Sequence, residues 1–176
     1  MKKSSTATDS QEDTQDNELQ DLFLDELADT LHSETQLTKA LPKMIQAADS
    51  DDLTQALEAH LEETQGHIKR LEQVFASLGE KAEKKPCKAM QGIIAEGDEL
   101  LGEWKKSPAI DAAIIAAGQK VEHYEIASYG TLIAWAKQLG HEEAAELLEQ
   151  TLEEEKAADE KLTEIALEAA NEKAEQ

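Results

Sequence analysis

The sequence has one cysteine, three prolines, eight glycines and only 3% aromatic residues among its 176 positions. A single cysteine excludes a disulfide within the chain and favours a reducing compartment. Helix breakers and strand-forming residues are sparse, whereas alanine, leucine, glutamate, lysine and glutamine are abundant. This composition favours helices and argues against an extensive sheet, so we expect an all-α protein.

Basic residues are also scarce, with 17 Lys and Arg against 39 Asp and Glu, which gives a net charge of −22. Such a surface repels phosphate, so nucleic acid and anionic membranes are excluded as partners. No apolar run approaches the roughly 18 residues of a membrane span, and the N-terminus lacks the apolar segment of a signal peptide. We therefore expect a soluble, cytoplasmic protein.

The chain divides into a polar tail, a helical domain and a short polar end. Residues 1–16 contain almost nothing apolar and are expected to be disordered, residues 17–170 to form one helical bundle, and residues 171–176 to fray. Capping residues and periodicity predict helices at about 17–48, 53–78, 89–104, 107–139 and 142–170. Asn17 and Ser107 are the expected N-caps at two helix starts, and the Asp49-Ser50-Asp51-Asp52 turn is expected to cap a third. Gly79 and Gly140 are expected to end two helices.

The lengths of the connections predict the topology. Short loops near residues 49–52 and 140 force the first and second long helices, and likewise the third and fourth, to run antiparallel. Residues 79–107 are long enough to cross the bundle, so the second and third long helices can run parallel. This arrangement is typical of a ferritin-like four-helix bundle, here with an additional helix in the crossover.

Acidic residues interrupt the apolar stripes of all four long helices. An unpaired buried carboxylate costs several kcal/mol, so such groups are protonated, paired or bound to metal. Their occurrence at similar depths on every long helix predicts a shared metal site. The candidate ligands are Glu34, Glu63, His67, Glu122, Glu125, Glu155 and Asp159.

The spacing of the candidate ligands in the sequence groups four of them into two pairs. Glu63 and His67, like Glu155 and Asp159, lie four residues apart and therefore on one helical face. Carboxylates and an imidazole that project inward from four helices form the ligand set for paired iron or manganese ions. The usual motif places His three residues after Glu, so His60 remains an alternative imidazole, and Glu122 and Glu125 remain alternatives on the third long helix.

Several longer motifs carry a family resemblance. They include His60-Leu-Glu-Glu-Thr-Gln-Gly-His67, Pro86-Cys-Lys-Ala-Met90, Glu122-His-Tyr-Glu-Ile-Ala-Ser-Tyr129 and Glu154-Glu-Lys-Ala-Ala-Asp-Glu-Lys-Leu162. Together they resemble the YciF/YciE-type ferritin-like proteins over about residues 18–168. The resemblance implies a rubrerythrin-like bundle, a homodimer, a di-iron site and an association with the bacterial stress response.

Two main functions are consistent with this pattern. The first is a di-iron protein, with two Fe per chain or Mn instead, that reacts with oxygen or peroxide as a ferroxidase, peroxidase or catalase. Glu34 and Glu125 would be terminal ligands and Glu63 and Glu155 bridging ones, with His67 and Asp159 completing the set. The second is a noncatalytic helical stress protein that acts by association. A hydroxylase with an organic substrate is a third possibility.

Overall fold

The protein is an all-α bundle in the computed structural model, which describes residues 17–175 and contains no strand within that range. The predicted tail, residues 1–16, lies outside the described residues. The helices are α1 (Glu18–Ala47), α2 (Asp51–Ser77), α3 (Lys88–Trp104), α4 (Ile110–Leu139), α5 (Glu142–Ile165), a π-helical turn (Ala166–Ala170) and α6 (Asn171–Ala174). None of them is long and apolar enough to span a bilayer.

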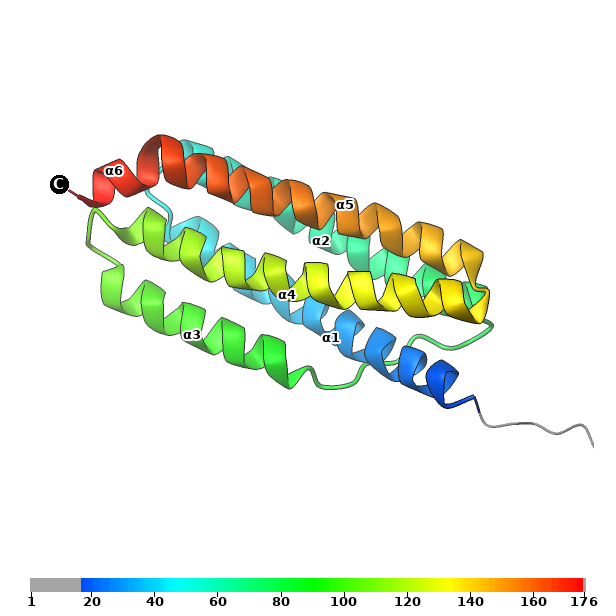
Figure 1. The fold of residues 1–176 in the computed structure, drawn as a ribbon. Coiled ribbons are helices and arrows are strands. Elements are labelled where there is room, and N and C mark those ends of the chain that lie inside the picture. Colours follow the sequence, from blue (N-terminus) through cyan, green and yellow to red (C-terminus); the bar gives the residue numbers. More distant parts are fainter. Residues whose placement is uncertain (1–16, 176) are drawn as a thin grey trace, which may run out of the picture.

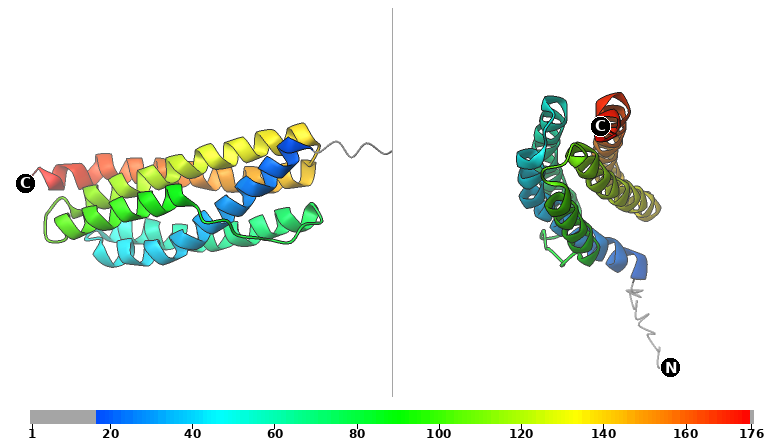
Figure 2. Two further views of the ribbon diagram at one scale, coloured as in Figure 1. Left: turned by 90° about the horizontal axis from the view of Figure 1, so that it is seen from below. Right: turned by 90° about the vertical axis from the view of Figure 1, so that its left-hand side faces the viewer.

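Four long helices form the bundle, and α3 lies outside it (Figures 1 and 2). Around the bundle, α1 packs on α2, α2 on α5, α5 on α4 and α4 on α1, while α3 packs on α4 and α1. The hairpins α1–α2 and α4–α5 are antiparallel, and the crossover through α3 makes α2 and α4 parallel. The predicted ferritin-like topology is confirmed.

Local chemistry accounts for most of the helix boundaries. The Asn17 side chain accepts a hydrogen bond from the Gln20 amide, and Ser50 Oγ accepts one from the Leu53 amide, so both are N-caps. Gly79 and Gly140, with φ of 74° and 78°, take the left-handed conformation that favours glycine after a helix. These four boundary assignments were predicted correctly.

Two boundaries differ from the prediction. Ser107 does not cap α4 directly: its Oγ accepts from the Ala109 amide in a turn, and the helix begins at Ile110. This local turn competes with the helix for the hydroxyl, as serine side chains commonly do. At the other end the chain stays helical beyond Ala170, and the Lys173 ammonium contacts Asp49 and the buried Asp111. That contact ties α6 to the α1–α2 loop and to α4.

The apolar core consists of two clusters separated along the bundle axis. One cluster is built around Leu41, Leu57, Ile114 and Leu162, and the other around Phe23, Leu27, Leu71, Leu132 and Leu148. On each long helix, polar residues lie between the residues of the two clusters. The bundle therefore holds a polar layer across its middle.

Candidate metal centre

The polar layer is made of side chains that the regular helical repeat turns inward. Counted over the whole residue, each of its members is less than 6% exposed, which is unusual for ionisable residues. The members are Glu34 of α1, His60, Thr64 and His67 of α2, Glu122 and Glu125 of α4, and Thr151 and Glu155 of α5. The sequence prediction that charged groups from all four helices converge is met by these positions.

These side chains form two groups that could each hold a metal ion. His60, Glu122, Glu125 and Glu155 form the first, and Glu34, His67 and Glu155 form the second. Within each group the ligand atoms lie within 4.8 Å of one another. Glu155 belongs to both groups, so its carboxylate lies where the two groups meet.

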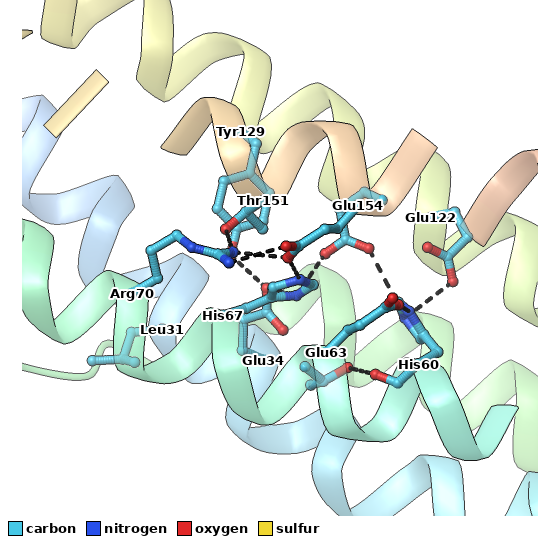
Figure 3. Close-up of polar contacts among 12 residues, drawn as sticks. Leu31, Glu34, His60, Glu63, His67, Arg70, Glu122, Tyr129, Thr151 and Glu154 are labelled. Carbon is cyan, nitrogen blue, oxygen red and sulfur yellow. Dashed lines mark hydrogen bonds and ion pairs between the residues drawn. The ribbon is translucent and has the colours of Figure 1, made fainter. Parts of the chain in front are cut away.

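The first group centres on His60. Its Nε2 lies 3.4 Å from Glu122 Oε1 and 3.9 Å from Glu155 Oε2, and its Nδ1 lies 3.5 Å from Glu63 Oε2. Figure 3 shows the His60 ring between Glu63 and Glu122. The imidazole that the spacing left as an alternative thus lies inside the centre.

The second group centres on His67. Its Nδ1 lies 3.1 Å from Glu155 Oε1 and 3.5 Å from Glu34 Oε1. The Tyr129 hydroxyl, fully buried, donates a hydrogen bond to Glu34 Oε1 and fixes that carboxylate. His60 and His67 therefore both face the centre, one in each group.

Many atoms of the layer have no hydrogen-bond partner among the described residues. They are Glu34 Oε2, both ring nitrogens of His60, His67 Nδ1, Glu122 Oε2, and both carboxylate oxygens of Glu125 and of Glu155. Each unsatisfied buried polar group costs on the order of 1–3 kcal/mol, and more when it is charged. Such atoms, all oxygen or imidazole nitrogen and all facing one space, are the donors that iron and manganese take. The residues present therefore fit a metal ion of this kind.

Burial and mutual repulsion shift the protonation of the layer. Burial raises the pKa of Glu34 and of Glu125, and for Glu125 the neighbouring carboxylates raise it further. Burial also raises the pKa of Glu122 to about 8, although His60 opposes the shift.

The two histidines shift in the same direction for a different reason. Burial alone would lower their pKa, but the carboxylates around them raise the pKa of His60 to about 9 and that of His67 to about 10. Without metal, protons thus take the place of cations in the layer.

A second layer of contacts holds His67 from the outside. Its Nε2 lies 2.9 Å from Glu154 Oε2, and Arg70 donates two hydrogen bonds to the same carboxylate and one to Thr151 Oγ1 (Figure 3). Glu154, whose side chain is 36% exposed, was not among the predicted site residues. Arg70, three residues after His67 and thus on its face, was the available signal.

Two predicted ligands lie outside both groups. Glu63 has a side chain 44% exposed and reaches only His60 at the edge of the centre. Asp159 lies 3.0 Å from Nε2 of the exposed His123, because its short side chain, one turn beyond Glu155, points to the outer surface of α4. The structure brings together Glu34, His67, Glu122, Glu125 and Glu155 of the predicted set, and adds His60.

The comparisons with known proteins agree with this architecture. A family model described as a domain of unknown function, DUF892, matches residues 18–175. The chain belongs to this family. Protein YciF of Escherichia coli strain K12 is 51% identical over 158 residues, which cover 89% of this chain and 95% of YciF. The predicted resemblance to YciF is thereby confirmed.

Three solved structures superpose on the bundle. The E. coli stress protein YciF gives a TM-score of 0.83 at 51% identity, over 87% of this chain and 97% of YciF. YcfI of Rhodopseudomonas palustris gives a TM-score of 0.80 at 53% identity, over 82% of this chain and 92% of YcfI. A Xanthomonas campestris protein, XCC3681, matches at 20% identity with a TM-score of 0.65, over 84% of this chain and 89% of XCC3681. At this identity the match supports the fold alone.

Proposed function

We propose that this DUF892 protein binds two metal ions, iron or manganese, in the polar layer and reacts with oxygen or peroxide during stress. The observation that carries the proposal is Glu155, whose two unpartnered oxygens face two groups of donors at once. A lone buried carboxylate would be better replaced by an apolar side chain. The Glu155 carboxylate is instead flanked by two imidazoles and three further carboxylates, and it would be stabilised by cations bound on both of its sides.

Charge balance supports two divalent ions in particular. The layer has four buried glutamates, Glu34, Glu122, Glu125 and Glu155, which together carry −4 when ionised. Two divalent cations carry +4, so metal would neutralise the layer without any proton. Neutral imidazoles of His60 and His67 would complete one coordination shell each.

The residues around the ions have distinct tasks. Glu155 would hold the pair together, and Tyr129 keeps Glu34 turned toward His67 through its hydroxyl. The apolar clusters close the layer on both sides along the bundle axis. A bound pair of redox-active ions supplies the electrons for reduction of oxygen or peroxide. Manganese suits the same oxygen-rich donors, because hard oxygen ligands discriminate poorly between the two metals.

A second candidate is the noncatalytic role. YcfI of R. palustris is described as a proposed structural protein, and YciF as a stress protein. Under this alternative the layer stays protonated, with His60 and His67 charged against the glutamates, and the protein acts by association. The two candidates differ in one measurable property, which is tight binding of metal.

The decisive experiment is an anaerobic titration of metal-free protein with Fe(II), counting tight sites per chain. The proposal expects about two sites in the wild type and loss of the paired site in Glu155→Gln. Glu160→Gln, which removes an exposed carboxylate on the same helix, is the matched control and should bind like the wild type. Absence of any tight site for Fe(II) or Mn(II) would favour the noncatalytic role.

The proposal also includes a homodimer, and oxygen or peroxide as the reactant. Light scattering during size-exclusion chromatography tests the first. Oxidation of bound Fe(II) after addition of oxygen or of peroxide tests the second. A monomer, or bound iron that neither reactant oxidises, would contradict the corresponding part of the proposal.

A further inference from the structure

The two ends of the metal centre differ in how they are closed. On the His67 side, the Arg70 guanidinium spans Thr151 and Glu154 and covers the imidazole (Figure 3). Arg70 and Glu154 neutralise each other there, and the three hydrogen bonds of the guanidinium hold this side closed. On the His60 side the corresponding cover is Glu63, a carboxylate that is 44% exposed.

A cavity of about 420 Å³ opens beside His60, between α2 and α5. His60, Glu63 and Glu122 contribute to its wall together with Asp52, Glu168 and one cation, Lys161. Apolar residues such as Leu57, Ala158 and Leu162 form much of the rest. Both ring nitrogens of His60, whose side chain is 7% exposed, and Glu122 Oε2 are buried there without a hydrogen-bond partner. The cavity thus ends on unsatisfied donor atoms of the metal centre.

An acidic groove adjoins this cavity on the surface of α5. Its lining is Glu63, Glu146, Glu149, Gln150, Glu153, Glu154 and Ala157. Glu63 also lines the cavity, and it is the only ionisable residue that the two share. One carboxylate therefore joins the acidic surface to the interior.

We infer that divalent cations enter the metal centre between α2 and α5, and that Glu63 is the transit ligand that delivers them to His60. The inference rests on the proposed function, because it concerns the same centre. Glu63 binds the arriving cation at the surface and releases it inward. It is not a permanent ligand of either ion, in contrast to the bridging role that the sequence suggested for it.

The distances allow such a transfer in short steps. Glu63 Oε2 lies 3.5 Å from His60 Nδ1, and the other nitrogen of the same ring lies 3.4 Å from Glu122 Oε1 and 3.9 Å from Glu155 Oε2. Glu63 and His60 Nδ1 can hold one cation together, and rotation of the imidazole, or exchange of the cation to the other ring nitrogen, then presents it to Glu122 and Glu155. A net charge of −22 raises the local concentration of cations over the whole surface, and the groove directs them to Glu63.

The experiment follows binding of Co(II) to metal-free protein by stopped-flow absorbance, which needs no oxygen chemistry. A transit ligand lowers the barrier for entry and exit alike. Glu63→Gln should therefore slow association and dissociation by the same factor, roughly tenfold each, which is the low end of charge-steered rate effects. The number of bound ions, the dissociation constant and the final spectrum should stay as in the wild type.

Glu62→Gln is the matched control, because it removes the same charge from the exposed residue that directly precedes Glu63 on α2. It should leave both rates nearly unchanged. Equal rates in Glu63→Gln and Glu62→Gln would place the entrance elsewhere and overturn the inference. So would a weaker affinity or a changed spectrum in Glu63→Gln, which would make Glu63 a permanent ligand. Failure of the wild type to bind Co(II), Fe(II) or Mn(II) would instead overturn the proposed function itself.

Discussion

The Nε2 atom of His67 lies 2.9 Å from Oε2 of Glu154, while Nδ1 of the same ring faces Glu34 and Glu155. A carboxylate on one nitrogen keeps a proton there and leaves the other nitrogen free to bind metal. Arg70 holds Glu154 through two hydrogen bonds, so the ring is oriented from the surface of the bundle inward. This makes Glu154 a positioning residue rather than a ligand.

Removal of Glu154 should weaken metal binding without removing a donor from the centre. In Glu154→Ala the His67 ring loses its partner and can rotate or bind its proton at the wrong nitrogen. Loss of such an outer partner costs about tenfold or more in metal affinity. Equilibrium titration with Co(II) measures this change, and Glu153→Ala, which removes the adjacent exposed carboxylate, should have almost no effect. Equal affinities in the two variants would count against a positioning role.

Substitution of Tyr129 by Phe should destabilise the metal-free protein. The Tyr129 hydroxyl donates to Glu34, and both side chains are buried, so the substitution leaves a carboxyl oxygen without its donor. The expected loss is about 1–3 kcal/mol in the free energy of unfolding, measured with urea in the presence of a chelator. Tyr124→Phe is the comparison, because its hydroxyl contacts only the half-buried Asp29 and Cys87 Sγ, a weak hydrogen-bonding partner, and not a buried carboxylate. A loss no larger than that of Tyr124→Phe would contradict this account of Glu34.

Most of the fold follows from local features that the sequence displays. Helix stripes, the caps Asn17 and Ser50, the glycines at 79 and 140 and the length of the crossover together fix the bundle topology. Ser107 was misassigned because a hydroxyl can serve a turn as easily as a helix start.

The centre was predicted less completely than the fold. Periodicity identifies which residues face inward, so Glu34, Glu125 and Glu155 were found. Periodicity does not say how deeply a side chain is buried. Glu63 and Asp159 share a helix face with residues of the metal centre, but their side chains lie at its edge. The partnership of Arg70, Glu154 and His67 depends on how α2 and α5 pack, which no single-helix pattern contains.

Two glycines on the bundle helices should respond differently to substitution by alanine. Gly66 on α2 has no neighbouring atom within 4 Å of an added Cβ, whereas a Cβ on Gly118 of α4 would lie 2.9 Å from Leu162 Cδ1. Gly66→Ala should therefore stabilise the protein by about 0.5–1 kcal/mol through the lower entropy of the unfolded chain. Gly118→Ala should give no such gain, because Leu162 must shift within the core. Thermal and urea unfolding measure both, and equal stabilisation would imply that α4 and α5 separate easily.

Metal binding should release protons, and the affinity should increase with pH. In the metal-free protein the raised pKa values of about 9 for His60, about 10 for His67 and about 8 for Glu122 keep these groups protonated at pH 7. Ligands bind metal in the deprotonated form, so filling the centre should displace about three protons or more. As the pH rises toward these values, fewer protons remain to be displaced and binding becomes tighter.

Calorimetric titration with Co(II) at pH 7, in buffers of different ionisation enthalpy, counts the released protons directly. Glu122→Gln should release about one proton fewer, because the proton it holds at pH 7 is lost with the carboxyl. His123→Gln removes an exposed imidazole outside both groups and should match the wild type. Binding without proton release would mean that these side chains are not displaced by metal, and it would place the metal outside the layer.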